Sequence, residues 1–235
     1  MDGGSGDSTR DIATRFGATV LDHDGQGVGS ARMAGILAAR SRWVFLLDSD
    51  VILPDGALAA LLDELNGRDL VGLQVRLHSV SGGPGYWGQA LARHHQRGRG
   101  DNKWFGFAAT LFDRRTLIEH PFDRSLPSGE DLDLARRLSR HRTPVGISKT
   151  TVATHILEDR FHFARRQWLA DGQGIAAVLL KERWPVWLLV LPALAGLRGA
   201  VLTLARREVR GLPFYVGLVV FNYLGIARQL FARWG

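Results

Sequence analysis

Two aspartates that follow a run of apolar residues give the clearest chemical signal in this sequence. Asp48 and Asp50 stand one residue apart, directly after the apolar residues 43–47. The run predicts a buried parallel strand, and ligands of open α/β sheets bind at the carboxyl ends of such strands. Carboxylate oxygens suit Mg²⁺ or Mn²⁺, ions that bridge the phosphates of a diphosphate. The pair therefore predicts a metal-dependent phosphate site, with a solvated loop of helix-capping acids as the alternative.

A second acidic cluster opens a predicted helix at residues 128–139. Glu130, Asp131 and Asp133 fall near its start, where the helix dipole stabilises negative charge. Helix capping is therefore the simpler explanation, and the one that this pattern favours on its own. The functional alternative is a carboxylate general base that takes the proton of an acceptor hydroxyl.

A third motif combines small residues with an arginine. Gly27, Gly29, Ser30 and Ala31 lie at the start of a predicted helix and are followed by Arg32. Small residues let a phosphate approach the backbone closely, and an arginine side chain pairs with it. An ordinary flexible turn is the alternative interpretation of these residues.

These motifs need elements that hold them, and the apolar periodicity predicts an alternation of strands and helices. The predicted strands cover residues 18–21, 43–47, 70–77, 105–112 and 145–152, and the predicted helices cover residues 9–16, 31–39, 55–65, 86–96, 114–119 and 128–139. Such alternation indicates an α/β fold with a mixed or parallel sheet. The 235 residues suffice for one large domain, or for one domain with an appendage.

Composition narrows the class of protein. The formal net charge of +7, supplied almost entirely by arginine, favours phosphate-bearing partners such as nucleotides or anionic lipid head groups. No aromatic-basic platform or helix-turn-helix spacing indicates nucleic-acid binding. Because the sequence has no cysteine, a disulfide scaffold, a thiolate metal site and a cysteine nucleophile are excluded.

The character of the sequence changes near its C-terminal third. Two strongly apolar runs cover residues 184–197 and 212–227, with Arg206, Arg207 and Arg210 between them. Each run is shorter than the roughly 20 residues of a spanning helix, and arginines on the outer side would oppose the positive-inside tendency. We therefore expect interfacial or re-entrant helices. Short spanning helices and helices packed on the core or on a partner are the alternatives.

In their order and spacing the motifs resemble those of family 2 glycosyltransferases of the GT-A fold. The matching pieces are residues 2–9, 29–35, 46–50, 122–123 and 130–134, so the resemblance covers roughly residues 2–180. It implies a mixed, Rossmann-like sheet of the nucleotide-diphospho-sugar transferase type in a domain at 1–158. A basic amphipathic connector at 159–183 and C-terminal, membrane-associated hydrophobic helices at 184–235 would follow.

The resemblance implies donor and metal roles for residues that match the family motifs. Asp2, Gly3, Arg32 and Asp48 match donor-binding positions. Asp48 and Asp50 match the metal-binding motif, with Asp50 as the more direct ligand of Mn²⁺ or Mg²⁺. His155 follows the last predicted strand, where some GT-A enzymes supply a further metal ligand; a structural histidine is the alternative.

The resemblance also implies catalytic and acceptor roles. Asp131 matches the general base of inverting members, and Glu130 stands beside it in the same motif. Four further residues resemble a basic-aromatic segment that could hold the acceptor or the diphosphate, with a solvated amphipathic helix as the alternative: Arg165, Arg166, Gln167 and Trp168.

The sequence departs from the family pattern in two respects. Family members carry two strands before the loop at residues 2–8, and a sheet without them would expose an apolar edge. Met33 also replaces the asparagine that is usual in the motif around Arg32.

The resemblance implies a metal-dependent, inverting transfer of a sugar from a UDP- or GDP-sugar to a lipid-linked or cell-envelope glycan. The enzyme would act at the cytoplasmic face of the cell membrane, with no nucleic-acid partner. A non-catalytic, membrane-associated binding or scaffolding protein derived from the same fold is the alternative. A phosphatase that uses the first aspartate as nucleophile needs a later lysine and acidic pair, which the sequence does not offer convincingly.

Overall fold

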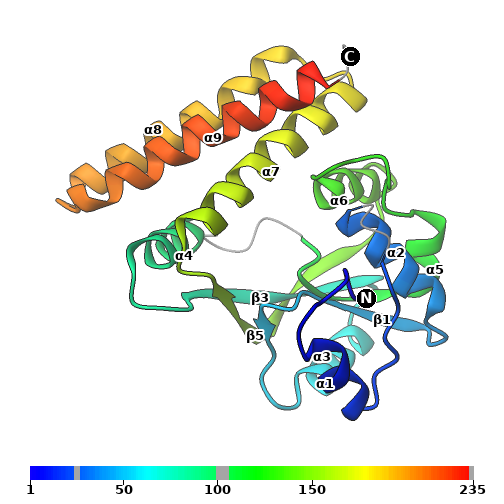
Figure 1. Ribbon diagram of the computed structural model, residues 1–235. Helices are drawn as coiled ribbons and strands as arrows, with labels where there is room; N and C mark the ends of the chain where they lie inside the picture. The colour runs from blue at the N-terminus through cyan, green and yellow to red at the C-terminus, as the bar shows by residue number, and fades with distance from the viewer. Residues whose placement is uncertain (24–26, 99–105, 233–235) are drawn as a thin grey trace.

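The computed structural model of the chain describes residues 1–23, 27–98 and 106–232. A twisted sheet occupies the lower half of the molecule in Figure 1, and the long C-terminal helices form a layer above it. Helix α4 (Tyr86–Gly98) lies at one end of this arrangement, and α2 (Val28–Ala38), α5 (Arg114–Glu119) and α6 (Glu130–Arg140) lie at the other.

Five strands in the described part of the chain form one mixed sheet in the order β1-β4-β3-β5-β2. These strands are β1 (Trp43–Leu47), β2 (Val51–Ile52), β3 (Gly72–Ser81), β4 (Ala109–Asp113) and β5 (Val145–Leu157). Only β3 and β5 pair in parallel, and the other neighbours pair antiparallel. The predicted α/β class with a mixed sheet is confirmed. The predicted start of the fourth strand at residue 105 lies outside the described residues.

Two of the strand predictions are wrong. Strand β1 is not a parallel strand: it pairs antiparallel with β4, and among the described strands it forms one edge of the sheet. Its apolar run arises because both faces of the strand are packed, Val44 towards α2 and α6 and Phe45 towards α3 (Ala57–Asn66). Residues 18–21 form no strand, and this region contributes only an isolated bridge between Asp2 and Asp22.

The predicted helices of the first 140 residues are confirmed with small shifts at their ends. They are α1 (Thr9–Arg15) and the helices α2 to α6 given above. Two apolar clusters hold these helices to the sheet. Met33 and Ile36 of α2 pack with Leu134 of α6 on one face, and Leu61 of α3 packs with Leu73 of β3 on the other.

The C-terminal region forms three long helices, α7 (Phe161–Lys181), α8 (Leu191–Ala205) and α9 (Leu212–Phe231), with short 3-10 turns at Val186–Val190 and Val209–Gly211. The expectation that the apolar runs are too short to span a membrane is wrong. With their turns the helices extend over Val186–Ala205 and Val209–Phe231, 20 and 23 residues. The first continues through Arg198 because a single arginine does not interrupt helical hydrogen bonding. Length and composition therefore permit spanning, a criterion that core helices of soluble proteins also meet.

Helix α7 packs against α9 with their backbones in close contact. A side chain built on Gly172 of α7 would collide with the backbone carbonyl of Asn222, and one on Gly225 of α9 would collide with the carbonyl of Leu169. Trp168 fills the adjoining cluster against Phe214 of α9. In this arrangement α7 lies between the sheet and the helices α8 and α9.

Candidate active site

An arginine joins the three motifs that the sequence singled out. The Arg32 guanidinium, on α2, donates through Nη2 to Asp48 Oδ1 at 2.9 Å and through Nη1 to Glu130 Oε1 at 2.8 Å. Arg32 and Glu130 are largely buried, with side chains 13% and 12% exposed. Burial raises the pKa of both Asp48 and Glu130, and the charge of Arg32 opposes this shift. The end of β1 and the start of α6 thus meet at one cation.

The second aspartate of the pair has a different partner. Asp50 Oδ2 lies 3.2 Å from His155 Nε2, and β2 pairs with β5 in register next to them. The hydrogen bond and charge of His155 lower the pKa of Asp50 against the opposing effect of burial. Behind the histidine, Ser79 Oγ lies 3.4 Å from Nδ1 of His155. His155 is therefore held in place on the side away from Asp50.

The residues at this edge of the sheet have the chemistry to hold a divalent cation. No group of three or more His, Cys, Asp or Glu side chains gathers as a metal site in residues 1–23, 27–98 and 106–232. Asp50 and His155 form a pair, and Asp48 lies two residues from Asp50 on the same strand end. A cation that keeps waters and binds phosphates needs only one or two protein carboxylates.

Two cavities meet at the Arg32 network. The first, of about 760 Å³, is lined by the start of α6, by α7 and by residues of α8 and α9; we call it the helix-side cavity. The second, of about 930 Å³, runs along α2 and the open edge of β1 and includes Asp50; we call it the strand-edge cavity. Arg32, Asp48 and Glu130 line both. This network forms a common wall between two spaces that are each large enough for a ligand.

Asp131 lies in the helix-side cavity, and no cation pairs with it among the described residues. Within that part of the chain its Oδ1 accepts one hydrogen bond, from the adjacent backbone N–H of Leu132. The N-cap of α6 is Gly129, and no side chain caps the helix. Asp133 is buried and bound instead by Arg137 and Lys181. Among the described acids of this cluster, Asp131 thus faces a cavity with a carboxylate that neither caps the helix nor forms an ion pair.

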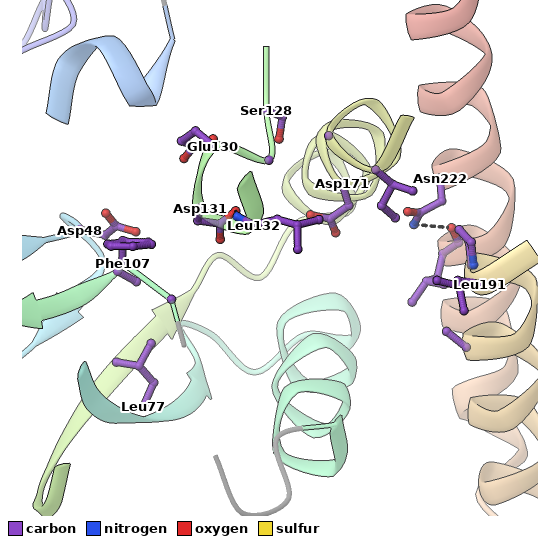
Figure 2. Close-up of a pocket in the computed structure, with 18 of the residues that line it drawn as sticks. Asp48, Leu77, Phe107, Ser128, Glu130, Asp131, Leu132, Asp171, Leu191 and Asn222 are labelled. Carbon is purple, nitrogen blue, oxygen red and sulfur yellow. Dashed lines mark hydrogen bonds between the residues drawn. The ribbon is translucent and has the colours of Figure 1, made fainter. Parts of the chain in front are cut away.

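Sequence reasoning missed a second acid in the helix-side cavity. Asp171 lies on α7, and its side chain is exposed to the space in front of Asp131. The surrounding cavity wall, and secondarily the negative charge of Asp131, raise the pKa of Asp171 to about 7. In Figure 2 the labelled side chains follow one another from Asp48 through Glu130 and Asp131 to Asp171. No motif signals Asp171, because it belongs to the site only through the packing of α7.

The close approach of α7 to α6 depends on two glycines. A Cβ built on Gly174 would lie 2.9 Å from the backbone N of Gly129 and 3.0 Å from its Cα. Gly129 has a φ of +81°, a conformation that glycine adopts without strain. The start of α6, and with it Asp131, therefore rests directly on α7.

The predicted donor residues at the N-terminus lie in a self-contained loop. The carboxylate of Asp2 is buried and accepts hydrogen bonds from the backbone N–H groups of Gly4 and Ser5 and from the Ser5 hydroxyl. These bonds, the hydroxyl of Ser5 first, lower the pKa of Asp2. Gly3 is exposed in the same loop. Asp2 here fixes the loop, and neither residue lines the two cavities.

The four residues of the basic-aromatic segment lie outside the two cavities. Trp168 is buried in the aromatic cluster between α4, α7 and α9, Arg165 and Arg166 are exposed, and Gln167 is half-buried. The small-residue motif before Arg32 also has a packing role, because a Cβ on Gly29 would lie 3.3 Å from Cβ of Glu130. The smallness of Gly29 therefore allows α6 to approach α2.

Comparisons with known proteins identify the family and the fold of the chain. The sequence model of the family described as "Glycosyl transferase family 2" matches residues 1–122. An uncharacterized glycosyltransferase of Mycobacterium tuberculosis is 42% identical over 72 residues, which cover 30% of this chain and 33% of the relative. The match thus spans only about a third of that protein.

Solved structures of glycosyltransferases share the fold. A mannosyltransferase from Pyrobaculum calidifontis, solved with GDP-Man and Mn²⁺, is 14% identical with a TM-score of 0.60 over 93% of this chain and 75% of its own. Glucosyl-3-phosphoglycerate synthase from Mycobacterium tuberculosis, solved with Mn²⁺, UDP and glucosyl-3-phosphoglycerate, is 19% identical with a TM-score of 0.55 over 79% of this chain and 68% of its own. The sheet, the motif order and the family match lead to one conclusion: the chain belongs to glycosyl transferase family 2.

Proposed function

We propose that this protein is a metal-dependent, inverting glycosyltransferase that moves a sugar from a UDP- or GDP-sugar to a lipid-linked or cell-envelope acceptor. The observation that carries the proposal is the wall formed by the Arg32 network between two cavities. Asp50, paired with His155, lines the strand-edge cavity, and Asp131 lines the helix-side cavity. The strand-edge cavity would hold the nucleotide and the helix-side cavity the acceptor. The similar structures were solved as complexes with Mn²⁺ and UDP or GDP-Man, which supports the donor class.

In this mechanism Asp131 acts as the general base. Its carboxylate takes the proton of an acceptor hydroxyl, the hydroxyl oxygen forms a bond to the anomeric carbon, and the bond from that carbon to the diphosphate breaks with its electron pair. Arg32 keeps Asp48 and Glu130 in place during the transfer. Asp50 and His155, with Asp48 nearby, would hold Mn²⁺ or Mg²⁺. When bound, the cation supplies positive charge that stabilises the leaving diphosphate.

The membrane part of the proposal is supported by the outer face of α8 and α9. Large apolar side chains are exposed along it, among them Trp187, Leu194, Leu197, Val216 and Val220. Only 22% of the apolar stretch within Val186–Ala205 and 33% of that within Val209–Phe231 is buried in the structure. An apolar face of this extent is typical of a surface that meets lipid or a partner. We propose that it lies in or at the cytoplasmic leaflet.

The first test is thermal stabilisation by UDP and GDP, each with and without Mn²⁺. A ligand at 100 times its dissociation constant stabilises the native state by about 2.7 kcal/mol, which corresponds to a rise in Tm of about 5–10 °C for a chain of this size. We expect the Mn²⁺-dependent part of the rise to vanish in Asp50→Ala and to persist in Asp63→Ala, an exposed acid on α3. Stabilisation that is unchanged in Asp50→Ala would contradict the metal assignment.

The second test concerns the base. Asp131→Asn should lower sugar transfer by about 10²–10⁴-fold while the nucleotide still raises Tm, because Asp131 lies in the helix-side and not in the strand-edge cavity. Full transfer activity in Asp131→Asn would refute the assignment. A protein that neither binds nucleotide nor transfers sugar would favour the non-catalytic binding or scaffolding alternative.

A further inference from the structure

We propose that the helix-side cavity is built for an amphiphilic acceptor whose head group is uncharged and rich in hydroxyls, and that Asp171 is the residue that selects this head group. The apolar part of the acceptor would lie against α8 and α9. This inference rests on the proposed function, because it assigns the acceptor class of the same site. The inference extends the proposed function by predicting that neutral head groups bind in preference to phosphorylated ones.

The first step concerns charge. The described residues that line the cavity include four acids, Asp48, Glu130, Asp131 and Asp171, and one cation, Arg32. Arg32 already uses both terminal nitrogens on two of these acids. A phosphate bound in front of Asp131 would therefore face carboxylates without a free cation on the described walls. The first turn of α6 also borders the cavity, and there the N–H of Leu132 is already bonded to Asp131. With four acids against one paired cation, the described lining favours a neutral head group over a phosphate.

The second step concerns the free carboxyl of Asp171. Among the described residues it makes no hydrogen bond and no ion pair, although it lies on a well-packed helix. A carboxyl group offers several acceptor positions and, when protonated, one donor, which matches the hydroxyls of a sugar or polyol. Its raised pKa allows both protonation states near neutrality. Asp131 and Asp171 would thus grip neighbouring hydroxyls, with Asp131 on the reacting one.

The third step concerns the far wall. Beyond Asp171 the cavity is bounded by Leu191, Pro192 and Ala195 on the α8 side and by Leu218 on α9. In Figure 2, Asn222 and Leu191 lie on the far side of Asp171 from Asp131. Leu191 is also 47% exposed and belongs to the apolar outer face of α8. The cavity wall and the proposed membrane surface therefore share residues, which suits a ligand with a polar head and an apolar tail.

The test uses the whole chain in phosphatidylcholine nanodiscs, without a donor. Binding of decyl β-D-glucopyranoside, decyl phosphate and 3-phosphoglycerate would be titrated by saturation-transfer NMR, with empty discs to subtract partitioning into lipid. We expect wild type to bind the glucoside at least fivefold more tightly than either phosphate. In Asp171→Lys the affinity for the glucoside should fall at least fivefold, and the affinity for decyl phosphate should rise. The matched control Asp63→Lys, at an exposed position of α3, should behave as wild type.

Asp171→Asn is the second variant, because it keeps the size and hydrogen bonding of the residue and removes only its charge. This variant should bind the glucoside with an affinity within about threefold of wild type, and it should still bind decyl phosphate more tightly than wild type does. The proposal is overturned if either phosphate binds wild type as tightly as the glucoside, or if both Asp171 variants behave as Asp63→Lys does. Because no donor is present, this result is independent of the proposed function, which fails separately if no nucleotide raises Tm.

Discussion

Replacing Arg32 by methionine tests whether one cation holds the two acidic motifs together. Methionine keeps much of the apolar stem of arginine and removes the guanidinium that bonds Glu130 at 2.8 Å and Asp48 at 2.9 Å. Glu130, 12% exposed, is then left as a buried carboxylate without its cation. Asp48, 39% exposed, is left with substantial access to water.

The two ion pairs should contribute unequally. Loss of one partner of a fully buried pair costs about 3–5 kcal/mol and loss of an exposed pair about 0–1 kcal/mol. The Arg32–Glu130 pair lies between these limits, at about 2 kcal/mol, and the half-exposed Arg32–Asp48 pair adds about 0.5 kcal/mol. We therefore expect Arg32→Met to lower the free energy of unfolding by about 2–3 kcal/mol, or Tm by about 5–10 °C.

A double-mutant cycle separates the pair from the loss of packing. Arg32→Met, Glu130→Gln and the double variant would be unfolded thermally under identical conditions, and the coupling energy taken from the four values. We expect a coupling of about 1–2 kcal/mol, because either single change leaves one half of the same pair. A coupling below about 0.5 kcal/mol would refute the reasoning and would reduce Arg32 to a surface cation.

Two further predictions concern the packing of α7 against α6 and the loop that precedes it. Lys181 and Ser125 hold the pKa of Asp123 at about 2 against the effect of burial, below the unfolded value of 3.8. The ionised Asp123 carboxylate should therefore stabilise the fold by about 2 kcal/mol above pH 4 and lose this effect as pH falls towards 2. Asp123→Asn should therefore destabilise at pH 6 and much less at pH 2.5 in urea unfolding; an equal loss at both would contradict the assignment. Gly174→Val should reduce sugar transfer more than nucleotide-dependent stabilisation, because its side chain would press on Gly129, whereas Gly6→Ala, which has nothing within 4 Å, should change neither. Equal effects of the two glycine variants would show that α6 does not rest on α7.

The parts of the fold and site that follow from local patterns could be predicted from the sequence. The acids after β1 and at the start of α6, and the alternation of helices and strands, are local features, and the structure brings Asp48, Glu130 and Arg32 within bonding distance. The direction of β1 could not be predicted in this way. An apolar run reports that both faces of a strand are covered, and it carries no information about which neighbour pairs with it.

Asp171 shows why the rest of the site escaped prediction. It stands in a helix between residues whose types indicate packing, and it enters the cavity only because α7 crosses over the start of α6. That crossing is set by contacts distant in sequence, the backbone of Gly174 against Gly129 and that of Gly172 against Asn222. The basic-aromatic segment at the start of the same helix was the more visible pattern, yet its Trp168 is used in the core.

Helix α7 therefore links the apolar helices to the start of α6. One of its faces carries Gly172, against the backbone of α9, and another carries Gly174, against the residue that begins α6. Neither contact has a flexible side chain between the backbones to absorb a displacement, and packed interiors transmit such strain. A movement of α9 in a lipid environment would pass through α7 to the position of Asp131. Placement of α8 and α9 in lipid, as proposed above, would on this reasoning also affect the position of the proposed base, so sugar transfer is best assayed in a lipid environment.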